Sequence, residues 1–165
     1  MKKKVKQLLP VLLLASTLLL TTSSTGSMNW TGNYVPVFME RSELEKSVFF
    51  DQEKHALVNP GKIYSKDQFL FINEKYKGIH VIDNSDSRHP EKVGFIVAPG
   101  CIDMAVKGNI LYLDNAVDLV AIDLTERKVT ERIENVFPEP LSPENYKYLD
   151  KRPDEKFILV GWNKK

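Results

Sequence analysis

The chain has 165 residues, 42% of them hydrophobic, which is enough for one modest domain with its own core. Its 23 basic and 22 acidic residues nearly balance, so no basic excess draws it to nucleic acid or to an anionic membrane surface. A single cysteine excludes an internal disulfide, and stability must therefore come from packing.

The N-terminus has the layout of a secretory signal peptide. Lysines at positions 2, 3, 4 and 6 precede an apolar run from Leu8 to Leu20. As a helix this run spans roughly 20 Å, which is too short for the ~30 Å hydrocarbon core of a bilayer. We therefore predict that residues 1–26 are a signal peptide and that the protein is exported. Because these residues hold four lysines and no acids, the mature chain carries a net charge of −3.

The cleavage region, TTSSTGS, fits two different peptidases, and the sequence leaves both open. Small residues up to Gly26 suit the ordinary signal peptidase, with a cut before Ser27. The same stretch resembles a bacterial lipobox in which Ser27 stands where the lipid-bearing cysteine would be. Because a hydroxyl cannot replace the thiol in lipid transfer, we expect that the chain is not lipidated as written. It should then be periplasmic or extracellular, and it would contact a membrane only if it were lipidated.

Residues 27–60 read as an N-terminal extension. An extended apolar piece comes first, followed by a helical turn in which Ser42 and Glu45 have capping-box spacing, and then by a short apolar run that ends at Phe50. A polar loop then closes with a turn cluster at Asn59, Pro60 and Gly61.

Residues 61–136 contain an internal repeat of 40 residues. Short β-rich runs follow one another every eight to twelve residues, and GIHVID at 78–83 returns as DLVAID at 118–123. Aligned without gaps, Leu70 meets Ile110 and Phe71 meets Leu111. This pattern predicts two consecutive four-stranded antiparallel sheets of blade-like length, with residues 137–165 supplying one further strand.

Details of the repeat predict how its strands are used. Both GIHVID and DLVAID are apolar on successive residues, so we expect both faces of these strands to be covered. Asp83 and Asp123 end their strands and are predicted to accept hydrogen bonds from the following turn. In the fourth strand of the first unit, Val93, Phe95 and Val97 are expected to share one side.

The segment GIHVIDNSDSRHPEKVGFIVAPGCIDMAVKGNILYLDNAVDLVAID resembles the LVIVD-repeat family of β-propeller-like bacterial surface proteins, many of them lipoproteins of the Bacteroidetes envelope. The matching elements are the strand that ends in an acid, the Pro90 turn, the 99–100 junction and the hairpin turn at 107–109. The resemblance implies a binding or scaffold role, and it supplies no established active site that can be carried over to residues of this sequence. The second copy lacks the proline turn, so its fourth strand is expected to slip by two or three residues.

Candidate chemical residues are few. Asp103, Asp114, Asp118 and Asp123 lack calcium-loop spacing and read better as turn-capping acids. The three histidines lack zinc-ligand spacing, and His80 reads as a partly buried strand residue. Cys101 reads as a small apolar residue at the start of a strand. The sequence therefore predicts no cofactor and no metal.

Residues 137–165 begin with prolines at 138, 140 and 143, which forbid a regular strand there, and end in a strand over 156–162. Tyr146, Tyr148 and Trp162 are a candidate contact surface.

Together these observations predict an all-β partial propeller that acts as a non-enzymatic envelope module for a protein or a glycan. Two blades leave open sheet edges and an uncovered apolar face, so self-association or another partner is expected. The alternative is a hydrolase-type enzyme with its acids on the repeat loops.

Overall fold

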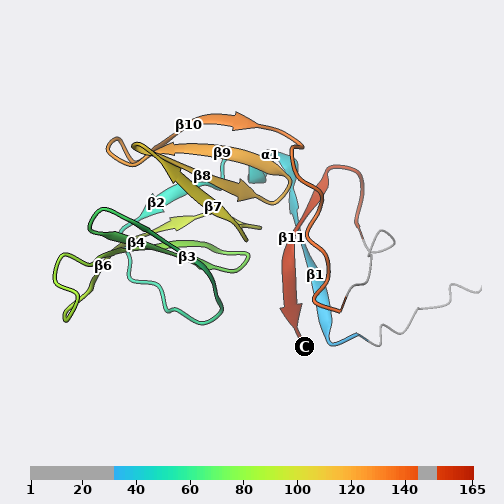
Figure 1. Ribbon diagram of the computed structural model, residues 1–165. Coiled ribbons are helices and arrows are strands. Elements are labelled where there is room, and N and C mark those ends of the chain that lie inside the picture. Colours follow the sequence, from blue (N-terminus) through green and yellow to red (C-terminus); the bar gives the residue numbers. More distant parts are fainter. Residues whose placement is uncertain (1–31, 145–151) are drawn as a thin grey trace, which may run out of the picture. The chain divides into compact units, whose positions relative to one another are not determined.

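The computed structural model describes residues 32–144 and 152–165, which form three antiparallel sheets and one short helix (Figure 1). The all-β class predicted from the sequence is confirmed. The elements in chain order are β1 (Tyr34–Glu40), α1 (Arg41–Leu44), β2 (Phe49–Asp51), β3 (Pro60–Lys66), β4 (Phe69–Glu74), β5 (Gly78–Asp83), β6 (Glu91–Val97), β7 (Met104–Lys107), β8 (Ile110–Asn115), β9 (Asp118–Asp123), β10 (Lys128–Ile133) and β11 (Phe157–Lys164).

The first large sheet has five strands in the order β2-β6-β5-β4-β3, so the prediction of four was wrong. The fifth strand is β2, which comes from the N-terminal extension and pairs antiparallel with β6. Gly94 of β6 makes room for it, because a Cβ there would lie 2.3 Å from Cζ of Phe50. The extension is therefore part of the first sheet.

The second large sheet has the four predicted strands, in the order β10-β9-β8-β7. Its last strand carries a bulge at Thr130, and β6 of the first sheet carries one at the equivalent residue, Val93. The bulge leaves Val93 exposed, so its predicted place beside Phe95 and Val97 was wrong. The shared irregularity marks the two sheets as copies of one unit.

Strand pairing corrects the alignment of the two copies. Phe71 pairs with Val81 in the first sheet, and Tyr112 pairs with Ala121 in the second. Phe71 therefore corresponds to Tyr112, and not to Leu111 as the ungapped alignment had it. The cause is the β8–β9 turn, which is one residue shorter than the β4–β5 turn. The fourth strand is displaced by three residues, within the predicted range.

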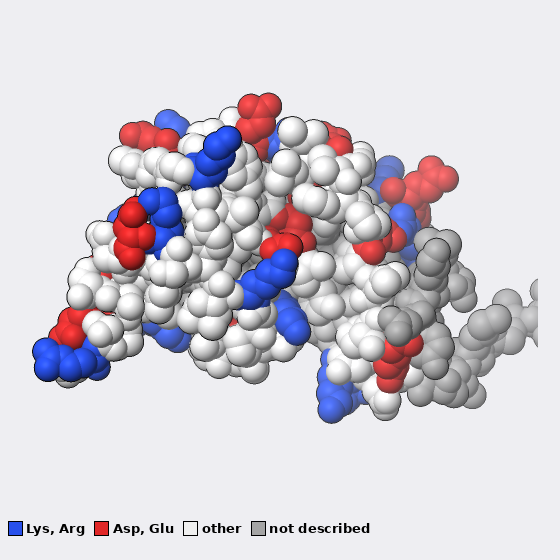
Figure 2. All heavy atoms as spheres, in the orientation of Figure 1, with Lys and Arg blue, Asp and Glu red and all other residues white. Residues whose placement is uncertain are grey.

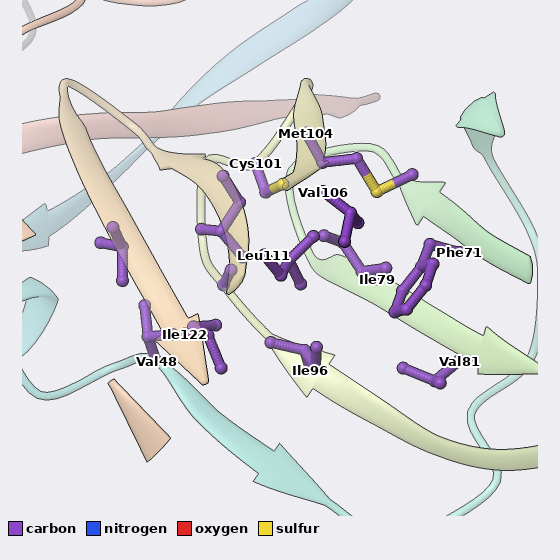
Figure 3. Packing of buried hydrophobic residues seen from close by; sticks show 13 residues of the cluster. Val48, Phe71, Ile79, Val81, Ile96, Cys101, Met104, Val106, Leu111 and Ile122 are labelled. Carbon is purple, nitrogen blue, oxygen red and sulfur yellow. The ribbon is translucent and has the colours of Figure 1, made fainter. Parts of the chain in front are cut away.

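The two large sheets pack face to face and enclose the main core. In Figure 3, side chains of the first sheet such as Phe71 and Ile79 point toward side chains of the second such as Leu111 and Ile122. The first sheet also contributes Tyr64, whose hydroxyl donates to the carbonyl of Val106 at 3.1 Å. Face-to-face burial of this kind is the main stabilising contribution to a sandwich of two sheets.

The third sheet pairs β1 with β11 and so joins the two ends of the described chain. Its residues Ile158 and Val160 pack with Leu44 of α1 and with Ala116 and Val117 of the β8–β9 turn. The sheet thereby closes one end of the second repeat.

The helix α1 begins two residues earlier than the capping box implied. Its N-cap is Glu40, which makes no side-chain cap hydrogen bond, and Ser42 lies inside the helix. The capping-box prediction was therefore wrong, because β1 runs directly into the helical turn. Within the described residues, no helix is both long and apolar enough to cross a membrane.

Candidate functional site

The two predicted turn acids accept hydrogen bonds within their own turns. Oδ1 of Asp83 accepts from the amide of Ser85 at 2.8 Å, and Oδ1 of Asp123 accepts from the amides of Thr125 and Glu126 at 2.8 and 2.9 Å. The hydroxyl of Ser85, which donates to Oδ1 of Asp83 at 2.6 Å, and the Ser85 amide lower the pKa of Asp83. The amides of Glu126 and Thr125 lower the pKa of Asp123. Both acids therefore stabilise the turns that follow β5 and β9.

The predicted contact surface does not form as a unit. Trp162 is only 6% exposed, and its ring nitrogen donates to the carbonyl of Pro140, so its assignment to an exposed surface was wrong. The cause is the β1–β11 pairing, which places β11 in a packed sheet. Tyr146, Tyr148 and the lipobox position Ser27 lie outside the described residues.

The best candidate site is the face of the second sheet that points away from the first, which we call the open face. It carries Tyr112 of β8, Leu119 and Ala121 of β9, and Ile133 of β10. By strand pairing these residues correspond to Phe71, Ile79, Val81 and Ile96, through which the first sheet packs on the second.

Exposure separates the two equivalent faces. Ile96 is 1% exposed in the core, whereas its equivalent Ile133 is 51% exposed on the open face. On the open face Tyr112 and Leu119 are half-buried, and Ala121 is only 8% exposed. A contiguous apolar patch on a sheet face is a candidate contact surface. The second sheet thus repeats a packing face, and no sheet among residues 32–144 and 152–165 packs on it.

A hollow of about 390 Å³ lies on the open face, beside Tyr112 and Leu119, and ends at Phe137. Asp114 lies at its wall, where its Oδ1 accepts from the amides of Ile102 and Asp103 at 2.9 and 2.8 Å. Burial raises the pKa of the Asp114 carboxyl despite these bonds. The hollow is therefore largely apolar, with the Asp114 carboxyl held in place by backbone amides and Asp103 also in its lining.

The opposite end of the stack, the outer face of the first sheet, is covered by residues 52–59, which we call the strap. The ring of His55 stacks on Phe95 with centroids 4.3 Å apart, and Lys92 donates to the carbonyl of His55 at 2.9 Å. Both oxygens of Glu74 accept backbone amides of the strap, from Val58 at 2.9 Å and from Asn59 at 2.6 Å. Hydrogen bonds from Lys92 and to Glu74 therefore fix the strap against the outer face of the first sheet.

Beneath the strap, His80 is buried against Glu74, with Nε2 and Oε2 3.4 Å apart. Burial lowers the pKa of His80 below 6.5, although Glu74 acts against this. Burial alone would raise the pKa of Glu74, but the two strap amides and His80 outweigh it and lower that pKa. Since both groups bind protons less readily in the folded state, acid weakens this arrangement.

A buried ion-pair network ties the helix α1 to the second sheet. Asp118 at the start of β9 has no exposed surface and lies 2.7 Å from Nη1 of Arg41 and 2.6 Å from Nη1 of Arg132. It also accepts the amide of Asn135 at 3.1 Å. Burial raises the pKa of Asp118, but these donors outweigh burial and lower it.

Two kinds of reactive site, a metal cluster and a reactive thiol, do not form among the described residues. These residues contain no group of three or more His, Cys, Asp or Glu side chains that could hold a metal ion. Cys101 is fully buried, and burial, with Asp114 nearby, raises the pKa of its thiol well above the usual value. A thiol in this state is not a nucleophile.

Charges do not gather into a patch of one sign on the face shown in Figure 2, where basic and acidic side chains alternate.

Comparison with protein families, curated proteins and solved structures finds no match to this chain. The function of the chain must therefore be inferred from its geometry.

The sequence predicted an uncovered apolar face but not the residues that form it, because the ungapped alignment placed Leu111 and not Tyr112 opposite Phe71. The signal that would have found it is the shorter β8–β9 turn, Ala116 and Val117, against the three residues between β4 and β5.

Proposed function

We propose that the protein is a non-enzymatic, exported module of the cell envelope, related to LVIVD-repeat proteins, that binds another protein through its open face. In this proposal its two large sheets are consecutive propeller-type blades. The observation that carries it is the equivalence of the open face with the face that joins the two sheets.

A protein partner fits this face better than a glycan does. The open face presents the apolar side chains of Leu119 and Ile133, which offer no hydrogen bonds. Tyr112 lies beside them, and Phe137 lines the hollow. Sugars need several placed polar groups, whereas an apolar sheet face is complementary to another apolar protein surface. The partner that matches best is a second apolar sheet face, on another protein or on a second copy of this chain.

The alternative, a hydrolase with acids on the repeat loops, gains no support from the placement of those acids. Asp83 and Asp123 bind turn amides, and Asp118 is saturated by two guanidinium groups. Asp114 is held by two backbone amides, and Asp103 pairs with Lys62. A general acid or base needs a carboxyl that faces bound substrate.

The test is photo-crosslinking from the open face in cells that produce the protein. A photoreactive amino acid at Leu119 should give one discrete protein adduct. The matched control is Ile63, which is 66% exposed on β3 of the other sheet and should give none. Equal labelling from both positions, or no adduct from Leu119, contradicts the proposal.

Mass measurement of the purified protein identifies the kind of partner. A dimer that Leu119→Arg converts to a monomer shows that the partner is a second copy. A wild-type monomer combined with a heterologous adduct shows that the partner is a different protein.

Export rests on the N-terminal sequence. With serine at position 27 the protein should be soluble and unlabelled by fatty acid, and Ser27→Cys should make it membrane-bound and lipid-labelled. Cell fractionation with labelled fatty acid checks this, and a soluble, unlabelled cysteine variant would show that the stretch is not a degenerate lipobox.

A further inference from the structure

A cleft opens between the two large sheets where their edge strands β2 and β10 face one another. Two hollows occupy it: an inner one of about 100 Å³ and an outer one of about 360 Å³. They are adjacent, because Phe50, Ile96, Ile122 and Arg127 line both. The outer hollow alone lies within the usual size range of small-molecule sites, roughly 300–1,000 Å³.

The walls of the cleft are apolar and come from both sheets. The first sheet contributes Phe69, Phe71 and Val81 to the inner hollow, and the second contributes Ile122. Leu124, in the turn after β9, completes the inner hollow. A chain of methylene groups could therefore exchange water for apolar contact on both sides.

The mouth of the cleft is basic. Arg127 and Lys128 line the outer hollow, and no acidic residue lines either hollow. The guanidinium of Arg127 lies 4.8 Å from the centre of the Phe50 ring. Lys128 contacts Glu126 at 3.5 Å, but this is an exposed pair that an incoming anion can displace.

Apolar walls beneath two cations fit one class of ligand. We propose that this cleft binds a free, single-chain amphipathic anion, such as a long-chain carboxylate, with its tail between the sheets and its head group at Arg127 and Lys128. The Phe50 ring, which lines both hollows, contacts the tail at the point where they meet. This site is separate from the open face and does not depend on it.

The test is calorimetric titration of the full-length protein with decanoate below its micelle concentration. Decan-1-ol supplies the same tail without charge, and decyltrimethylammonium supplies it with the opposite charge. Decanoate should bind at one site per chain. Decanol should bind about fivefold more weakly, because an ion pair at a partly exposed site contributes about a fivefold gain in affinity. The cation should show no detectable binding.

Two variants distinguish the contribution of the ligand's tail to binding from that of its head group. Val93→Trp should fill the inner hollow from its exposed position on the bulge and abolish binding. Arg127→Asn should weaken decanoate about fivefold and leave decanol unchanged. Asparagine tolerates the left-handed backbone of Arg127, whose φ is 54°. Lys107→Gln, an exposed lysine outside the cleft, is the control and should change nothing.

Several results would overturn the proposal. These are equal affinity for decanoate and decanol, binding that survives Val93→Trp in a folded protein, and saturation only above the micelle concentration. If Val93→Trp lowers the thermal midpoint, its loss of binding could come from misfolding, and the comparison of decanoate with decanol in Arg127→Asn is then the deciding test. Binding to anionic phospholipid vesicles without binding of monomeric decanoate would identify a membrane surface as the ligand and would also refute the proposed site.

Discussion

Replacing Asp118 by asparagine tests whether the buried ion pairs hold the helix α1 against the second sheet. The substitution keeps the volume of the side chain, so it creates no cavity, but it removes the negative charge that faces Arg41 and Arg132. The amide nitrogen of asparagine would also point a donor at guanidinium groups that are themselves donors. The two cations would then lack their buried counter-charge.

The expected loss of stability follows from the exposure of the two partners. Removing one member of a fully buried ion pair costs about 3–5 kcal/mol, because a charge is left without compensation. The side chains of Arg41 and Arg132 are 21% and 13% exposed, so water can compensate in part. We therefore expect the lower end, about 3 kcal/mol, and a fall of about 10 °C in the thermal midpoint for a domain of this size.

Urea unfolding at pH 7 measures this change, and Asp123→Asn is the matched control at the other end of the same strand. Asp123 is half-buried and accepts turn amides, which an asparagine oxygen can also accept. The urea midpoint of this variant should therefore stay close to that of the wild type. Hydrogen exchange at the Arg41 amide, which donates to Lys156, should accelerate only in the Asp118 variant. A loss below about 1 kcal/mol would refute the reasoning, because it would mean that solvent alone satisfies both guanidiniums.

Three further outcomes are expected. Burial lowers the folded-state pKa of His80 below its usual value, so the unfolded chain is protonated first, and the free energy of unfolding should fall as the pH drops from about 7 to 5. His80→Gln should flatten this slope in urea unfolding at several pH values, and an unchanged slope would contradict the reasoning. A Cβ at Gly78 would lie 2.0 Å from the carbonyl oxygen of Ile96, so Gly78→Ala should destabilise the protein by more than about 3 kcal/mol or prevent folding. Gly108→Ala meets no atom within 4 Å and should cost only about 1 kcal/mol of backbone strain. Comparable urea midpoints for the two variants would contradict the close approach at Gly78. Iodoacetamide should not label Cys101 in the native protein at pH 8 and should label it after unfolding, and rapid native labelling would show that the thiol is accessible.

Local signals in the sequence determined the secondary structure of the repeats. Alternating or continuous apolar runs bounded by turn residues predicted all eight strands from β3 to β10, since the side-chain period of a strand and the demands of tight turns act over a few neighbouring residues. Asp83 and Asp123 belong to this class, because each binds amides two or three residues further along the chain.

Tertiary structure alone decided which strands met and which faces were buried. The three residues of β2 form a strand only because β6 offers an edge and Gly94 leaves room for Phe50. Trp162 is buried because β11 pairs with β1, more than a hundred residues away, and no local pattern encodes that contact. The open face likewise depends on a turn that is one residue shorter, because successive strand residues point to opposite sides and a shift of one exchanges the two faces of a sheet.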